Sequence, residues 1–158
     1  MNYKNKLILD NSGKSPAFYL KKNKNFITKE NINFIKNFSN FNKIDSRICL
    51  HKNSKDKIQF MVNALYKSTK KYYYNYHKST DEYYFIISGK LQIIYFDKLN
   101  KKRKIVLSKN SNELFKMNKK IIHVTIPLTR VCVYLEIRQG PFISKTDSIF
   151  TKNFEKLS

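Results

Sequence analysis

Apolar and polar residues alternate along most of the chain, and this pattern predicts many short β-strands. The alternation is clearest at 58–66, where Ile58, Phe60, Val62 and Ala64 share one parity. The strands expected from the pattern are 7–9 (an edge strand), 47–51, 58–66, 72–77, 82–88, 90–96, 103–108, 113–117, 121–127 and 130–138. Closely spaced strands with polar turns between them are typical of an antiparallel sandwich or barrel.

One segment has the spacing of an amphipathic helix instead. Ile32, Ile35 and Phe38 recur at intervals of three residues, and Thr28 is a suitable N-cap. We expect this helix to lie across an opening of the sheet and to carry no chemistry. The predicted organisation is an N-terminal extension with the helix packing on the barrel (1–45), the barrel itself (46–142) and a loosely held C-terminal tail (143–158).

The chain is strongly basic, but the pattern of its charge argues against a dedicated nucleic-acid surface. It has 158 residues, enough for one domain with a core, and its net charge is +21. Lysine supplies 28 of the 32 basic residues and is scattered, as the codon bias of an AT-rich genome would produce. A nucleic-acid surface would more often cluster arginine on one face. A basic nucleic-acid-binding domain is therefore the least favoured function, and no specific nucleic-acid partner is expected.

Compartment is predicted from cysteine usage and hydropathy. Cys49 and Cys132 form no CxxC pair and are typical of small core residues in a reducing compartment. No apolar run reaches the roughly 18 residues that a membrane span requires. The apolar run near the start of the chain is also too short for a signal peptide. The expected location is the cytoplasm, with no membrane span.

Candidate chemistry is concentrated at 72–89 and returns once downstream. On a strand Asn75 and His77 share a face, and Glu82 begins the return strand after a polar turn. His123 lies near the start of a later predicted strand. Two imidazoles and a carboxylate on a rigid sheet form a ligand set that Fe(II), Mn(II), Ni(II) or Zn(II) accepts. The alternative is that the histidines are ordinary polar residues and that the glutamate is solvated.

These residues lie in a pattern that resembles a known family. The segment 75–89 reads N-x-H-x4-E-x6-G and is similar to the first cupin motif, H-x-H-x(3,4)-E-x6-G, and His123 falls where the second motif has its histidine. R-I-C-L-H at 47–51 and E-I-R-Q-G-P-F at 136–142 follow the order found in the WbuC family of cupin metalloproteins. Proteins of that family are encoded in bacterial surface-polysaccharide (O-antigen) gene clusters.

The resemblance implies an all-β chain with a cupin-type antiparallel β-barrel, a double-sheet jelly roll, and a short N-terminal helical segment. It implies that His77, Glu82 and His123 bind a divalent metal ion. Asn75 stands where the family normally has its first histidine, and an amide oxygen is a weaker ligand than imidazole for these metals. We therefore expect a weakened site. The usual P-x-G turn before the second-motif histidine is replaced at 118–120 by N-K-K, which places positive charge near the site.

The resemblance also implies a set of substrate-binding residues at the mouth of the barrel: Arg47, His51 and Gln59. The arginine is suited to clamp a carboxylate or phosphate. A structural role for Arg47 and Gln59, as a buried charge pair or a strand-bridging amide, is the alternative. Tyr73 and Tyr84 are expected beside the site as hydrogen-bond donors or apolar walls, or otherwise as core residues.

The function implied is that of a WbuC-like cupin that binds or acts on a sugar or nucleotide sugar in surface-polysaccharide biosynthesis. If the protein is an enzyme, a metal-dependent isomerase or epimerase is expected, with an oxygenase as the other option. The alternative is a non-enzymatic binding module with a degenerate metal site. Cupins often dimerise through sheet edges, so a homodimer through 7–9 or 47–51 is also expected.

Overall fold

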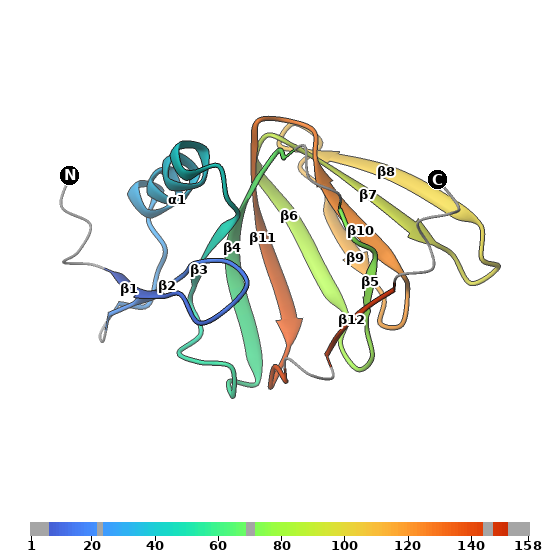
Figure 1. The fold of residues 1–158 in the computed structure, drawn as a ribbon, viewed down its shortest axis with the longest axis horizontal. Helices are drawn as coiled ribbons and strands as arrows, with labels where there is room; N and C mark the ends of the chain where they lie inside the picture. Colours follow the sequence, from blue (N-terminus) through green and yellow to red (C-terminus); the bar gives the residue numbers. More distant parts are fainter. Residues whose placement is uncertain (1–6, 22–23, 69–71, 144–146, 152–158) are drawn as a thin grey trace.

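The computed structural model describes residues 7–21, 24–68, 72–143 and 147–151, which form two β-sheets and one helix (Figure 1). The elements in chain order are β1 (Leu7–Asp10), β2 (Ala17–Leu20), α1 (Lys29–Asn42), β3 (Ser46–Cys49), β4 (Ile58–Tyr66), β5 (Asn75–His77), β6 (Glu82–Ser88), β7 (Lys90–Phe96), β8 (Lys102–Ser108), β9 (Leu114–Met117), β10 (His123–Pro127), β11 (Val131–Gln139) and β12 (Ser148–Phe150).

The predicted double-sheet, mainly antiparallel architecture is confirmed. One sheet has seven strands in the order β1-β2-β3-β4-β11-β6-β9, and the other has five in the order β12-β5-β10-β7-β8. The pairing of β2 with β3 is parallel. β1 is at an edge, as predicted, but β3 lies between β2 and β4 and offers no free edge for a second copy.

Two strands were not predicted by the alternation of apolar and polar residues. β2 has four residues, too few for a period of two to be distinguished from a short apolar cluster. β12 lies in the predicted tail, where Ser148 pairs with His77 and Phe150 with Asn75. The expectation of a loosely held tail is therefore wrong for these residues, while 144–146 and 152–158 lie outside the described part of the chain.

Helix α1 begins where its capping signal predicts. The Asn31 amide donates to the Thr28 hydroxyl at 3.2 Å, and the Thr28 amide donates to Asn31 Oδ1 at 3.0 Å, which completes a capping box. The helix ends at Lys43, whose left-handed backbone (φ 56°) allows its N–H to bond the Ser39 carbonyl. The sequence prediction of a Thr28-capped helix is confirmed.

The helix does not lie across an opening of the sheet as expected, although it does pack on the barrel. Ile35 is fully buried and packs with Ile48, Val62 and Val133 on the outer face of the seven-stranded sheet. Their strand neighbours of opposite parity, such as Asn63, point into the interior cavity, and the described lining of that cavity includes no residue of α1. Among the described residues, no helix is long and apolar enough to cross a bilayer.

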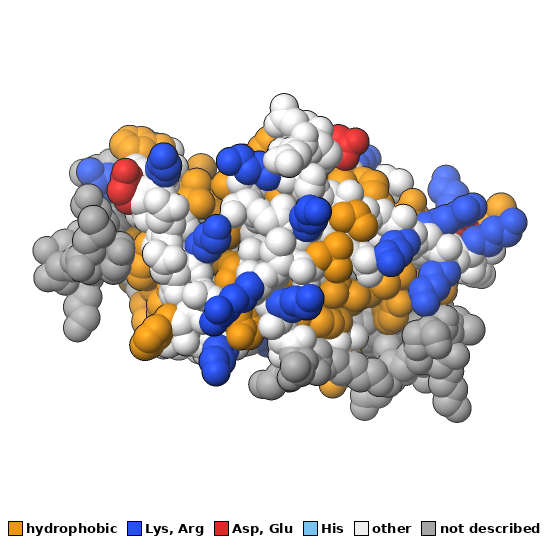
Figure 2. All heavy atoms as spheres, turned by 90° about the horizontal axis from the view of Figure 1, so that it is seen from above, with side chains coloured by type: hydrophobic (Ala, Val, Ile, Leu, Met, Phe, Trp, Pro, Cys, Tyr) orange, Lys and Arg blue, Asp and Glu red, His pale blue; other side chains and the backbone are white. Residues whose placement is uncertain are grey.

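An apolar core holds the two sheets together beside the cavity. Its fully or almost fully buried members come from both sheets: Tyr84, Ile86, Leu91, Ile93, Leu107, Met117, Cys132 and Tyr134. Cys49 and Cys132 are both buried free thiols, as expected of small core residues. Most of the described lysines are exposed, and Figure 2 shows lysine and arginine side chains scattered over one face among polar and apolar groups.

Candidate metal centre

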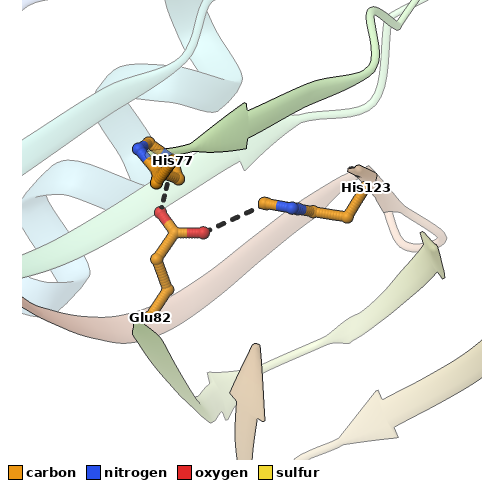
Figure 3. Close-up of side chains that lie close together, drawn as sticks. All are labelled: His77, Glu82 and His123. Carbon is orange, nitrogen blue, oxygen red and sulfur yellow. Dashed lines mark ion pairs between the residues drawn. The ribbon is translucent and has the colours of Figure 1, made fainter. Parts of the chain in front are cut away.

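Three strands bring His77, Glu82 and His123 together (Figure 3). The two histidines lie on β5 and β10, neighbours in the five-stranded sheet, where His123 is the cross-strand partner of Asn75. Glu82 begins β6 in the seven-stranded sheet and reaches across to both imidazoles. The cluster therefore connects the two sheets, and the predicted return of the chain after the 78–81 turn is what places the carboxylate opposite the histidines.

The carboxylate of Glu82 lies between the two rings. Its Oε1 is 2.9 Å from His77 Nε2, and its Oε2 is 3.0 Å from His123 Nε2. All three residues are at most 5% exposed. The nitrogen and oxygen atoms available as ligands lie within 4.8 Å of one another, a group compact enough to hold a metal ion. The Tyr84 hydroxyl donates to Glu82 Oε2 at 2.7 Å.

Charge and burial act in opposite directions on these groups. Burial alone would raise the pKa of Glu82, but hydrogen bonds and positive charge from His123 and His77 hold it well below its usual value. Burial likewise opposes the charged form of His123, but the hydrogen bond and charge of Glu82, together with the Ile121 carbonyl and the charge of Glu136, raise its pKa. Glu82 therefore stays ionised although it is buried, and its negative charge attracts a cation. A divalent metal ion balances this charge without protonation of the histidines.

Two buried atoms without partners indicate that a further group fits here. Asn75 Oδ1 and His77 Nδ1 are buried and make no hydrogen bond. An unpaired buried polar atom costs about 1–3 kcal/mol, so an acceptor on the His77 face of β5 is well suited as an additional ligand. His123 Nδ1 lies 3.0 Å from the Ile121 carbonyl, which fixes the ring with Nε2 towards the site. The donor set fits a divalent cation.

The lysines at 118–120 do not disturb this set. Lys119 and Lys120 are exposed and are not among the residues lining the cavity, so water screens their charge. Lys120 adopts a left-handed backbone (φ 65°), the conformation that glycine favours in such a turn. Its amide donates to the His77 carbonyl at 2.7 Å, and the Lys119 amide donates to Asp81. The turn therefore ties the two histidine-bearing segments together.

The cluster opens into a cavity of about 580 Å³ between the sheets. Every site residue predicted from the sequence lines it: Arg47, His51, Gln59, Asn75, His77, Glu82 and His123. Tyr84 lines it too, and is both a core residue and a donor to the cluster. Tyr73 is 57% exposed and precedes β5, so its expected place beside the site is wrong.

The residues predicted to bind substrate differ in what they have to offer. Gln59 donates to the Asp56 carbonyl at 2.9 Å and more weakly to two others, so its amide nitrogen holds the 53–56 turn. His51 Nδ1 accepts from the Phe60 amide at 3.0 Å, and burial lowers the pKa of the ring, which favours neutral imidazole. Arg47 takes part in none of the ion pairs of the described residues, and its charge lowers the pKa of Asp10 and of Glu136 from a longer distance.

A polar group on β4 and β11 was missed by sequence reasoning. Glu136 Oε2 accepts from Asn63 Nδ2 at 2.8 Å, and Tyr134 OH lies 3.5 Å from the same oxygen. Arg138 lies between two buried carboxylates, 3.9 Å from Glu136 and 4.0 Å from Glu82. Burial, together with the charge of Glu82, raises the pKa of Glu136. Polar residues at alternate positions of a predicted buried strand, 134, 136 and 138, were the available signal.

Comparisons with known proteins identify the fold. Similar solved structures include the capsular polysaccharide assembling protein CapF from Staphylococcus aureus (TM-score 0.55, 17% identity, 67% of this chain and 31% of that one). A structure of CapF with the inhibitor 3-isopropenyl-tropolone is also similar (TM-score 0.52, 19% identity, 61% and 28%). A structure of oxalate decarboxylase from Bacillus subtilis at pH 4.6 is similar as well (TM-score 0.52, 12% identity, 63% of this chain and 25% of that one). No family model matches the sequence, and no curated protein does.

These likenesses, with the two-sheet architecture, show that the chain has the cupin β-barrel fold. The chain spans only between a quarter and a third of the length of those structures. At such low identity the likeness concerns the fold alone, and any activity has to be argued from the site.

Proposed function

We propose that this protein is a WbuC-like cupin that binds a divalent metal ion and takes up a sugar or nucleotide sugar in bacterial surface-polysaccharide assembly. The observation that carries the proposal is the buried His77, Glu82 and His123 cluster at the inner end of a polar cavity, with the unpaired Asn75 Oδ1 beside it. Imidazole and carboxylate donors are accepted by Fe, Mn, Ni and Zn.

The cavity supports a polyhydroxylated ligand. Its volume of about 580 Å³ suits a small molecule. Its walls combine hydroxyl, amide and charged groups with aromatic rings, including Asn63, Tyr134 and Phe142. The segments at 47–51 and 136–142 that resemble WbuC both contribute to this lining. CapF, which shares the fold, is a capsular polysaccharide assembling protein, and this supports a role in the same area of metabolism.

An isomerase or epimerase is the activity that the polar group on β11 favours. A bound divalent ion would supply Lewis acidity towards a carbonyl or hydroxyl oxygen of the sugar. The protein must then accept a proton from the adjacent carbon and return it. Glu136 is placed for this task, because Asn63 fixes one carboxylate oxygen and burial favours holding a proton. Arg138, between Glu136 and Glu82, keeps the two carboxylates in fixed relation.

One observation favours a binding module without turnover. The hydrogen bonds of Glu82 with both histidines and Tyr84 already satisfy its carboxylate without a metal ion. A barrel held together in this way would bind an anionic sugar whether or not it carries a cation. In that case the three residues have a structural role, and the function of the protein is to bind its ligand without converting it.

The test uses a panel of nucleotide diphosphate sugars with wild type, His77→Ala and Glu136→Gln. Calorimetry measures binding, and proton NMR in D₂O detects solvent deuterium entering a sugar carbon. We expect metal-dependent deuterium incorporation in wild type, and loss of it in Glu136→Gln with binding retained. Binding that is unchanged in His77→Ala, with no deuterium incorporated by any protein, would establish the binding module. Absence of binding to the whole panel would overturn the proposal.

We infer a cytoplasmic location from the two buried free thiols, Cys49 and Cys132. A homodimer would use β1, since it is the edge of its sheet and two of its side chains, Ile8 and Leu9, are about half exposed.

A further inference from the structure

The loop between β1 and β2 reaches the mouth of the cavity, although it lies far from the cupin motifs in sequence. It reads N-S-G-K-S-P at 11–16, and Ser12, Gly13, Lys14 and Ser15 line the cavity that contains the His77, Glu82 and His123 cluster. The N-terminal hairpin is therefore part of the cavity wall.

Two cations from different elements meet at this mouth. A Cβ added to Gly13 would lie 3.3 Å from Arg47 Nη2, so the loop backbone packs directly on the guanidinium. The next residue, Lys14, places its Nζ 3.6 Å from the ring centre of Phe150 on β12. The lysine and the arginine thus both line one opening, between the hairpin, β3 and β12.

These two cations form no direct ion pair with a carboxylate, although Arg47 is near enough to Asp10 and Glu136 to lower the pKa of both carboxyl groups. Arg138 is flanked by Glu82 and Glu136. The ion pairs among the described residues include neither Lys14 nor Arg47. Asp10 begins the loop, and its Oδ1 accepts the Ser12 amide at 2.8 Å. The mouth therefore holds two cations that are in no direct ion pair with a carboxylate among the described residues.

The loop also presents unused hydrogen-bond donors. The Ser12 side chain already bonds the Asp10 carboxylate, whereas among the described residues no hydrogen bond is donated by the amides of 13–15 or by the Ser15 hydroxyl. Neutral donors beside a guanidinium and an ammonium match a group that has several acceptor oxygens and about two negative charges. Phe150, 47% exposed, adds an apolar surface next to Lys14 on which a base or sugar ring can stack.

We propose that Lys14, Arg47 and the 12–15 loop form a phosphoryl-binding site for the diphosphate of a nucleotide sugar. That the sugar part of the ligand points towards His77, Glu82 and His123 rests on the proposed function. The anion site itself does not depend on the proposed function. A Cβ at position 13 would lie 3.3 Å from Arg47 Nη2, so the loop and the guanidinium are adjacent parts of the site. A site of this kind selects nucleoside diphosphates over free sugars as the ligand class.

The test is calorimetric titration of the full chain with pyrophosphate and with citrate, an anion of similar charge that has carboxylates only. We expect pyrophosphate to bind wild type, and Lys14→Ala and Arg47→Lys each to weaken it about tenfold, which corresponds to about 1.4 kcal/mol. The matched control Lys109→Ala removes another exposed lysine outside the cavity and should change affinity less than about twofold. Because Lys14 is exposed, its variant keeps the fold.

Several outcomes would overturn the site. They are absence of pyrophosphate binding to wild type, citrate binding equally well, and an effect of Lys14→Ala no larger than that of Lys109→Ala. Loss of binding in His123→Ala with retention in Lys14→Ala would also overturn it, because the anion would then sit on the metal. Metal content, measured on the same samples, reports separately on the proposed function, so either proposal can fail alone.

Discussion

Asn75 is the single residue that most limits the proposed metal centre. Its unpaired Oδ1 lies on the His77 face of β5, where the cupin motif has a histidine. An imidazole at this position donates more strongly to Fe, Mn, Ni or Zn than an amide oxygen does. We predict that Asn75→His tightens metal binding by about tenfold, or about 1.4 kcal/mol, in competition with a chromophoric chelator. Asn75→Ala is the control and should weaken binding. Equal affinity in all three proteins would contradict a ligand role.

The buried thiols predict a loss of stability in alkali. Burial raises the pKa of Cys132 from 9.0 to about 12 and that of Cys49 to about 11. Above pH 9 the unfolded chain therefore loses thiol protons that the folded chain keeps. Stability should fall between pH 9 and 11, by up to about 1.4 kcal/mol per pH unit for each thiol. Urea unfolding of Cys132→Ala should show a shallower decline. An equal decline in both proteins would contradict this account.

Two of the proposed ligands, His77 and Glu82, could be predicted from the sequence because they lie in one short motif, and His123 was predicted from its resemblance to the second cupin motif. His77 and Glu82 are five positions apart on either side of one turn, so the chain keeps them close, and the two facing sheets turn their side chains towards each other. Glu136 and Arg138 could not be assigned in this way, since their place depends on the register of β11 with β6, where Arg138 pairs with Glu82. No sequence pattern marked Lys14 as a site residue, because only the folded β1–β2 hairpin places it in the same cavity wall as Arg47.

At the scale of elements, the end of α1 carries a correctable strain. Lys43 holds a left-handed backbone (φ 56°) at the helix C-terminus, where glycine is favoured. We predict that Lys43→Gly stabilises the protein by about 0.5–1 kcal/mol in urea unfolding, because the Cβ penalty is removed. Lys98→Gly, an exposed turn position without a left-handed backbone, is the matched control and should be neutral or destabilising. A gain no larger than that of the control would contradict the explanation.

Elements with strong local signals were predicted, and those that depend on partners were not. The Thr28 and Asn31 capping box predicts the start of α1, but the apolar stripe of the helix does not identify the surface on which the helix packs. It covers the outer face of the seven-stranded sheet rather than an opening. β12 exists because it pairs with β5, and three residues have no period of their own.

At the scale of the whole molecule, the effect of the net charge of +21 on nucleic-acid binding depends on how the charged residues are distributed over the surface. Lysine and arginine are scattered over the face seen in Figure 2 rather than aligned in a stripe. We predict weak binding to duplex DNA at low salt, without length or sequence preference, that disappears by about 150 mM salt. Fluorescence anisotropy against salt concentration measures it. Binding that persists at this salt with a preferred sequence would contradict the interpretation and favour a nucleic-acid function.

The candidate centre also joins the two halves of the molecule. Glu82 belongs to the seven-stranded sheet, and His77 and His123 belong to the five-stranded sheet. A cation held by all three would link the sheets where the cavity separates them, so ligand binding and fold stability are expected to rise together.

The most direct test of the account is metal content by inductively coupled plasma mass spectrometry, on protein purified without a histidine tag. Wild type is measured beside His123→Ala, with His51→Ala as the control for loss of a histidine that lines the cavity outside the cluster. The account predicts near-stoichiometric Fe, Mn, Ni or Zn in wild type and His51→Ala, and loss of it in His123→Ala. Wild type that stays free of metal after dialysis against each of these ions would contradict it.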